Sequence, residues 1–455
     1  MDSVLTDRWL EAQVHQAAAL WHASAGPWIH PSPSFTLREQ RARERAYDGA
    51  LGDVQRLTRA SARTAAAETE HRLIAAFAGF AAHALSLGPD TIDLLTHSFL
   101  PVGAELARWA HRFDPALPNA GIVQACRNAW TACGLQPLLG APMALTPAIL
   151  AYSLLYPYTD NYLDQRSIAQ DDKLRFNHRF RLRLQGNSLA PAGHHESCAW
   201  HMVALIEQQF PLPHHPDVYA SLLAIHAAQE QSVLQLGQSR SLHESTLLRI
   251  TCAKGGTSVL ADAALVHGIL ALGEAQFSFL WGALLQLGDD LQDIHEDLAR
   301  GSETLFTRAL RAGHPLDALV SQLLNLSDLT AARMDELPCG TPTHKALLRM
   351  SWRSLIQMAV AQADEFFTTP FLAELESRSP FRFAFLRSRR KKLDGNSGLF
   401  ERLFEILLDG ETESPRVPQV RGPQRQVLVA GVEAPGFRTW EPGTLAPPQT
   451  QGAPS

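Results

Sequence analysis

The feature of this sequence that most constrains its fold is a long, almost uncharged run that leads directly into a group of acids. Residues 270–288, LALGEAQFSFLWGALLQLG, contain a single charged side chain, Glu274. A helix that is apolar on all sides is buried, so acids at its end meet a cavity or a cation rather than open water. We therefore expect a buried helix over residues 263–288 of a helical protein. A membrane span fits less well, because His267, Glu274 and Gln276 interrupt the run.

The acids that follow are spaced for one side of a helix. Asp289, Asp293 and Asp297 recur every four residues, and Asp290 stands beside the first. An offset of four residues turns a helix by a net of about 40°, so the three carboxylates form one stripe. Such acids are often solvated surface, but the uncharged run before them favours a bound cation. A hard divalent ion such as Mg²⁺ prefers oxygen ligands, and substrate phosphates commonly complete its coordination.

An earlier segment, YPYTDNYLDQ, is the first acidic motif in chain order, and the Asp289–Asp297 segment is the second. The first motif places Asp160 and Asp164 four residues apart, with Asn161 beside Asp160. On a helix both carboxylates would share one side, although a solvated surface pair is the simpler interpretation of this motif taken alone. Pro157 lies three residues before Asp160, and proline kinks a helix or starts one. We therefore expect that the motif opens a helix instead of lying in the middle of one.

Composition excludes several classes of protein. The formal net charge of −6 argues against general nucleic-acid binding, which needs a strong basic excess. The five cysteines form no CxxC pair, so we expect reduced, mostly buried thiols and no zinc ribbon. The N-terminus has early acids and no basic segment followed by an apolar run, so we expect a cytoplasmic protein without a secretory signal.

Helical periodicity dominates the chain, for example over residues 60–85 and 345–367. Residues 1–55 are expected to form an N-terminal helical extension, and residues 56–409 the main helical domain. Residues 410–455 are rich in proline and glycine and cannot bury enough apolar surface to offset chain entropy, so we expect a disordered tail.

The histidine pairs His194-His195 and His214-His215 lie in proline-flanked segments, with no carboxylate at helical spacing. We expect structural or surface roles for them. His295 lies inside the second acidic motif but is expected to point away from the Asp289 stripe.

Three segments in order resemble the class I isoprenoid synthase superfamily. The segment from Asp160 to Asp164, DNYLD, is similar to the DDxxD motif of that family with asparagine in its second place. The segment from Gln286 to Asp293, QLGDDLQD, resembles the QxxDDxxD motif of trans-prenyl diphosphate synthases. Its continuation, DIHEDLARG, is similar to a segment of squalene and phytoene synthases. Between the two motifs, Lys254-Gly-Gly-Thr resembles a segment whose lysine binds diphosphate.

The resemblance implies an all-α, isoprenoid-synthase-type bundle around a central apolar pocket, with the two acidic motifs facing each other across its mouth. It implies about three Mg²⁺ ions held by Asp160, Asn161, Asp164, Asp289, Asp290, Asp293 and Asp297. Of these, the residues expected to be catalytic are Asp160, Asp164, Asp289 and Asp293. Diphosphate binding is expected from Lys254, Arg249 and Arg179. The pocket is expected to be lined by Tyr152, Tyr156, Phe277 and Trp281, although aromatic residues at helical spacing are more often ordinary core.

The expected function is that of a Mg²⁺-dependent terpene synthase, which ionises an allylic prenyl diphosphate and cyclises or deprotonates the carbocation. No RRG sequence follows the first motif, which disfavours chain elongation. A trans-prenyltransferase, either chain-elongating or head-to-head condensing, is the first alternative. A non-catalytic helical binding module is the second. The resemblance further implies a homodimer, and long apolar substrates imply peripheral membrane contact.

Overall fold

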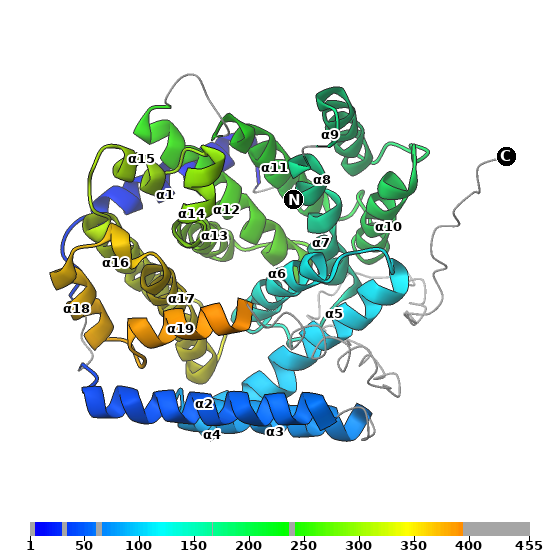
Figure 1. Ribbon diagram of the computed structural model, residues 1–455. Helices are drawn as coiled ribbons and strands as arrows, with labels where there is room; N and C mark the ends of the chain where they lie inside the picture. Colours follow the sequence, from blue (N-terminus) through cyan, green and yellow to red (C-terminus); the bar gives the residue numbers. More distant parts are fainter. Residues whose placement is uncertain (1–4, 30–33, 61–65, 166, 236–241, 395–455) are drawn as a thin grey trace.

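The computed structural model describes residues 5–29, 34–60, 66–165, 167–235 and 242–394, without the side chains of residues 60, 66, 67, 160, 164 and 392–394. Within these ranges every extended regular element is a helix, so the predicted all-α class is confirmed (Figure 1). The helices are α1 (Asp7–Ala23), α2 (Leu37–Ala60), α3 (Ala66–His83), α4 (Pro89–Leu94), α5 (Leu100–Phe113), α6 (Asn119–Leu138), α7 (Pro147–Tyr158), α8 (Asp160–Asp164), α9 (Gln170–Leu184), α10 (His194–Gln209), α11 (Pro216–Ser232), α12 (Glu244–His267), α13 (Leu272–Gln292), α14 (Ile294–Arg300), α15 (Leu305–Arg311), α16 (Asp317–Asp335), α17 (Pro342–Gln362), α18 (Thr369–Ser377) and α19 (Phe383–Asp394).

Helices α12 and α13 lie at the centre of the fold, and α6, α7, α11, α16 and α17 pack around them (Figure 1). Glycines allow the two central helices to approach closely. A Cβ atom built on Gly255 would lie 2.2 Å from the carbonyl oxygen of Gly282, and one on Gly256 would lie 2.5 Å from the Phe279 ring. Any larger residue at these positions would push the helices apart. The close pair fixes the register between the Lys254 segment of α12 and the acids at the end of α13.

The expectation of one continuous helix over residues 263–288 is wrong. Helix α12 ends at His267, and α13 begins only at Leu272. Gly268 caps α12 in the left-handed conformation, with φ of 78°, which glycine adopts without the steric cost that a Cβ brings. Burial of the run was predicted correctly, because Phe277 and Trp281 are both almost fully buried.

The N-terminal helices are integral parts of this packing. Helix α1 packs against α12, α13 and α16, and its Trp21 is 2% exposed. Helix α2 packs against α3, and its Tyr47 meets the rings of Phe381 and Phe385 edge-on near α19. The boundary expected at residue 55 falls inside α2. The tail expected over residues 410–455 lies outside the described residues.

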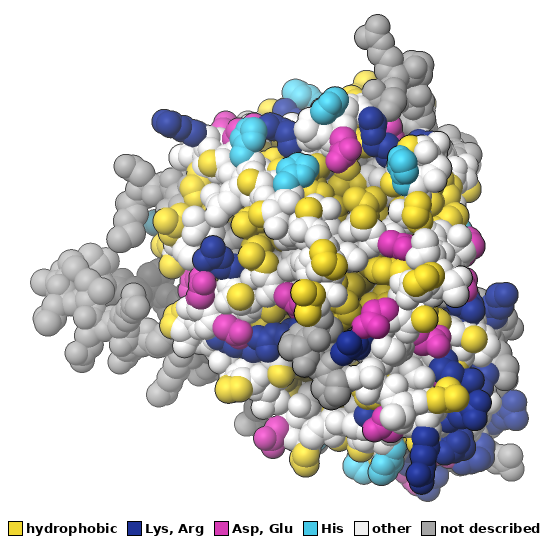
Figure 2. Space-filling view, turned by 90° about the vertical axis from the view of Figure 1, so that its left-hand side faces the viewer, with side chains coloured by type: hydrophobic (Ala, Val, Ile, Leu, Met, Phe, Trp, Pro, Cys, Tyr) yellow, Lys and Arg dark blue, Asp and Glu magenta, His cyan; other side chains and the backbone are white. Residues whose placement is uncertain are grey.

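The surface carries both signs of charge. In the space-filling view, Lys and Arg side chains gather at the lower right, and apolar side chains are scattered over the rest of this face (Figure 2). Among the described residues, no helix is both long enough and apolar enough to cross a bilayer.

Candidate functional site

A cavity of about 130 Å³ lies between the central helices and α6, α7, α9 and α11. Its wall brings together four side chains that the sequence analysis singled out from three separate segments: Tyr152, Tyr156, Lys254 and Asp289. We call it the Lys254 cavity. The remaining lining residues are Asn128, Leu155, Thr159, Phe180, Leu184, Leu222, Ile225, His226, Gln229, Ser258 and Gln286.

The second acidic motif adjoins this cavity through Asp289. Helix α13 ends at Gln292, yet the helical hydrogen bonds continue from Asp293 N to Asp289 O and from Asp297 N to Asp293 O, each at 2.9 Å. The three aspartates therefore follow one another by single turns, as their spacing predicts. All three are partly exposed, and of the three it is Asp289 that lines the cavity.

The carboxylates of this stripe disfavour one another's ionisation. Burial, followed by the charges of Asp289, Asp297 and Glu296, raises the pKa of Asp293 to about 6. The pKa of Asp297 is also raised, mainly by burial and further by Asp289. Lys254 acts in the opposite direction on Asp297, and Arg127 acts in the opposite direction on Asp293. A cluster that raises its own pKa values in this way is stabilised in its ionised form by a cation.

Asp290 has a different environment from the stripe. It is almost fully buried, and its two oxygens accept hydrogen bonds from Thr251 Oγ1 and Gln286 Nε2, both at 3.0 Å. Burial, and to a lesser degree the neighbouring Asp289, raise the pKa of Asp290 to about 7. Asp290, which the resemblance implies as a metal ligand, thus points toward α12 and joins the two central helices.

Of the three cationic residues that were expected to bind diphosphate, one lines the cavity and two do not. Lys254 lines the cavity, as expected for a diphosphate ligand. Arg249 pairs with Glu11 and contacts His15 on α1, with 2.8 Å between its Nη1 and the His15 Nε2. Arg179 pairs with Glu196 of α10 at 2.8 Å. Neither arginine lines the cavity.

A different arginine approaches the acids. Arg127 of α6 lies with its Nη2 3.9 Å from Asp289 Oδ1, and both side chains are about half exposed. Sequence reasoning missed Arg127 because no recognised motif surrounds it on α6. Arg127 lies 162 residues before Asp289 in the sequence, so their proximity could be inferred only from the packing of α6.

The aromatic wall of the cavity was predicted in part. Tyr152 and Tyr156 of α7 line it, and the Tyr152 hydroxyl donates to the carbonyl oxygen of Ser258 at 3.2 Å. Phe180 and His226 complete the wall, with ring centroids 5.3 Å apart in an edge-to-face arrangement. Both were missed. Phe180 lies between the arginines of HRFRLRL in α9. The sequence analysis considered the charged side of that helix and not its apolar side.

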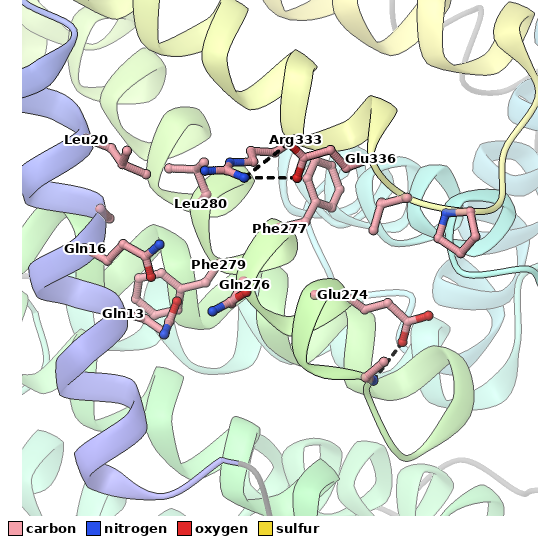
Figure 3. A pocket seen from close by; sticks show the side chains of 15 residues that line it. Gln13, Gln16, Leu20, Glu274, Gln276, Phe277, Phe279, Leu280, Arg333 and Glu336 are labelled. Atoms are coloured by element: carbon pink, nitrogen blue, oxygen red, sulfur yellow. Dashed lines mark hydrogen bonds and ion pairs between the residues drawn. The ribbon is translucent and has the colours of Figure 1, made fainter.

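The other two predicted pocket residues lie elsewhere. Phe277 lines a second cavity of about 340 Å³ between α1, α13 and α16. In Figure 3 it is seen beside Leu280, with Gln13 and Gln16 of α1 on the opposite wall. Trp281 is buried in the core, where its ring lies 5.4 Å from that of Trp352. The structure therefore separates Phe277 and Trp281 from the Lys254 cavity.

The first acidic motif opens a helix, as Pro157 predicted. Helix α7 ends at Tyr158, and the five residues Asp160–Asp164 form the separate short helix α8. Asn161 Nδ2 donates to Gln124 Oε1 of α6 at 3.3 Å. The side chains of Asp160 and Asp164 lie outside the described part of the chain, so their expected position opposite the Asp289 stripe stays a prediction.

A buried polar cluster lies near the cavity wall. Asn128, which lines the cavity, donates to Asp262 Oδ1 and to Ser153 Oγ, each at 3.2 Å. Asp262 is fully buried on α12, two turns after Lys254, and burial raises its pKa well above the usual range of an aspartate. The cavity wall therefore holds an amide whose position depends on a buried carboxyl group.

The prediction for His295 is confirmed, because its ring contacts Glu365 at 3.5 Å and not the aspartate stripe. Among the described residues, one group of three metal-binding side chains has ligand atoms within 4.8 Å of one another. It consists of Asp114, His194 and Cys198 and lies outside both acidic motifs.

In comparisons with known proteins, no family model matches this chain, and neither a curated protein nor a solved structure matches it significantly.

Proposed function

We propose that this chain is a Mg²⁺-dependent class I isoprenoid synthase of the terpene synthase type, acting on an allylic prenyl diphosphate. The observation that carries the proposal is the Lys254 cavity. Its lining combines a lysine and the first aspartate of the QLGDDLQD motif with aromatic side chains. A diphosphate at the polar end and a prenyl chain along the aromatic wall would match both chemistries.

The acidic stripe fits a hard divalent ion. Its donors are carboxylate oxygens. Burial first, and the neighbouring acids second, raise the pKa of Asp293, and a bound cation would offset both effects. Asp289, Asp293 and Asp297 would hold the ion once their side chains converge, because in the described part of the chain these three do not form a group with ligand atoms within 4.8 Å of one another. Mg²⁺, when bound, supplies charge neutralisation of the diphosphate leaving group.

The cationic side chains have a defined role in this proposal. Lys254 lines the cavity, and Arg127 reaches Asp289 from the side of α6. Both would donate to the diphosphate oxygens on which negative charge grows as the allylic carbon–oxygen bond breaks. The resulting carbocation would face the rings of Tyr152, Tyr156 and Phe180, whose electron-rich faces stabilise positive charge and exclude water.

The cavity is too small, as it stands, to hold a prenyl chain. Pockets that hold drug-sized ligands have volumes of roughly 300–1,000 Å³. At about 130 Å³, the Lys254 cavity is smaller. The proposal therefore requires side chains of α7, α9 or α11 to move when a prenyl chain enters.

A prenyltransferase is the second candidate function, favoured by one contact. Gln286 is the glutamine of the QxxDDxxD pattern and Asp290 is its second aspartate, and Gln286 Nε2 donates a hydrogen bond to Asp290 Oδ1 at 3.0 Å. The glutamine of the prenyltransferase-like motif thus takes part in the arrangement of the acids. A prenyltransferase would need a second prenyl substrate, whereas a terpene synthase would release diphosphate from one.

The testing experiment measures diphosphate release with Mg²⁺ from geranyl, farnesyl, geranylgeranyl and longer prenyl diphosphates, each with and without isopentenyl diphosphate, followed by mass spectrometry of the products. Release from a single allylic substrate, lost in Asp289→Asn and retained in Glu374→Gln, would support the terpene synthase. Glu374 is a suitable control because it is exposed on α18 and paired with Arg378, outside both acidic motifs. Release only with a second prenyl substrate would favour the prenyltransferase. Full activity of Asp289→Asn would contradict both, and no release from any substrate would favour the non-catalytic binding module.

A further inference from the structure

Three side chains of metal-binding type meet where the end of α5 lies against the start of α10. Asp114 caps the C-terminus of α5, His194 is the first residue of α10, and Cys198 follows one turn later. One ligand atom from each lies within 4.8 Å of the other two. None of the three lines the Lys254 cavity. We propose that this cluster is a zinc site.

The separations fit tetrahedral coordination. His194 Nε2 lies 3.7 Å from Asp114 Oδ1 and 3.6 Å from Cys198 Sγ. Zinc bonds of about 2.0 Å to nitrogen and oxygen and about 2.3 Å to sulfur place the nitrogen roughly 3.3 Å from the oxygen and roughly 3.6 Å from the sulfur. These two edges of a tetrahedron are thus met to within a few tenths of an ångström.

The donor set selects the ion. A thiolate and an imidazole are ligands for zinc and similar transition metals, whereas Mg²⁺ takes oxygen ligands. The cluster therefore differs in kind from the Asp289 stripe. On binding, the Cys198 thiol gives its proton to the solvent, so that the sulfur coordinates as thiolate.

Neighbouring groups orient the Asp114 carboxylate, and the His194 side chain is open to solvent. The Tyr158 hydroxyl donates to Asp114 Oδ2 at 2.8 Å, which holds the carboxylate with Oδ1 toward His194. Oδ1 also accepts from the backbone N–H of Ala116 at 3.1 Å. Cys198 is fully buried and the His194 side chain is 48% exposed. The ion would enter from the His194 side, and water would take the fourth position.

The site also bears on the first acidic motif. His195, the neighbour of His194, makes a hydrogen bond of 2.6 Å with the carbonyl oxygen of Tyr158 and stacks on Tyr162 of α8 with ring centroids 3.8 Å apart. An ion that fixes the start of α10 would therefore brace α8, which carries Asp160 and Asp164. The consequence for catalysis rests on the proposed function, but the binding of the ion does not.

The test uses the purified full chain, stripped with a chelator and titrated with Zn²⁺ and with Co²⁺ as a spectroscopic probe. We expect one ion per chain, a thiolate-to-cobalt charge-transfer band, and a higher melting temperature with Zn²⁺. Cys198→Ser should lose the band. His194→Ala removes a half-exposed ligand with little effect on folding and should weaken binding by about 10-fold or more.

Matched controls are Cys339→Ser and His214→Ala, which change a half-buried cysteine and an exposed histidine outside the cluster. Both should bind as the wild type does. The zinc site would be overturned by a wild type without a thiolate–cobalt band, or by unchanged affinity in His194→Ala. These readouts do not depend on prenyl diphosphates, so failure of the zinc site and failure of the proposed synthase activity are seen separately.

Discussion

Gly255 and Gly282 lie where the backbones of the two central helices meet. A Cβ on Gly282 would lie 2.0 Å from the Gly255 carbonyl oxygen, and one on Gly255 would lie 2.2 Å from the Gly282 carbonyl oxygen. The glycines thus allow a contact that no other residue permits. Lys254 precedes one of them, and Asp289 lies two turns after the other, so the same contact brings both side chains to one cavity.

Replacement of Gly255 by alanine should therefore destabilise the protein. The methyl group would meet backbone atoms, which cannot move away as a flexible side chain can, and we expect a loss of about 1–3 kcal/mol or more in the free energy of unfolding. Gly288→Ala is the matched control, because a Cβ there meets nothing within 4 Å. Alanine at that helical position should stabilise by about 0.5–1 kcal/mol. Denaturant unfolding of both variants measures the difference, and equal effects would show that the close contact has no energetic role.

Much of the arrangement at α13 could be predicted from the sequence, because it depends on local periodicity. Asp289, Asp293 and Asp297 lie on successive turns as their spacing requires. Pro157 correctly placed the start of a helix at the first motif. Helical spacing and the conformational limits of proline are properties of neighbouring residues, so they can be read without knowledge of the tertiary fold.

The cavity wall could not be predicted in the same way, because it depends on how distant helices pack. Phe277 has the spacing expected of a residue near Asp289, yet it lines the cavity beside α1. Arg249 lies five residues before Lys254 on α12, yet it faces Glu11 of α1. Both outcomes follow from the place of α1 against α12 and α13, which no local pattern indicates. Phe180 likewise reaches the cavity through the packing of α9 against α11, which is also a tertiary contact.

The proposed function predicts unequal roles for two arginines. Arg127→Gln should lower the kcat of diphosphate release by roughly 10- to 100-fold, because a donor near Asp289 is lost. Arg249→Gln should leave kcat unchanged and reduce stability by no more than about 1 kcal/mol, as expected for a surface ion pair with Glu11. Steady-state kinetics of both variants tests this. The reverse order of effects would mean that Arg249, and not Arg127, takes part in the reaction.

The separation of the two cavities predicts which aromatic residue controls substrate length. Tyr156→Leu enlarges the Lys254 cavity and should shift activity toward a longer prenyl diphosphate. Phe277→Leu enlarges the second cavity, beside α1, and should leave the substrate preference as it is in the wild type. The ratio of kcat/KM for farnesyl and geranylgeranyl diphosphate is the measurement. An equal shift in both variants would mean that the two cavities join when substrate binds.

The buried Asp262 predicts a pH dependence of stability. Burial raises its pKa, so between about pH 4 and the raised value the folded state binds a proton that the unfolded state has lost. The free energy of unfolding should therefore fall as pH rises through this window, by at most about 1.4 kcal/mol per pH unit from this one group. Asp262→Asn keeps an acceptor for Asn128 and removes the titration, so its stability should vary less with pH than that of the wild type. Asp171→Asn, at an exposed position in the first turn of α9, should retain the wild-type slope. Denaturant unfolding from pH 4 to pH 8 compares the three proteins, and parallel curves for the wild type and Asp262→Asn would mean that Asp262 ionises in the folded state as readily as in the unfolded chain.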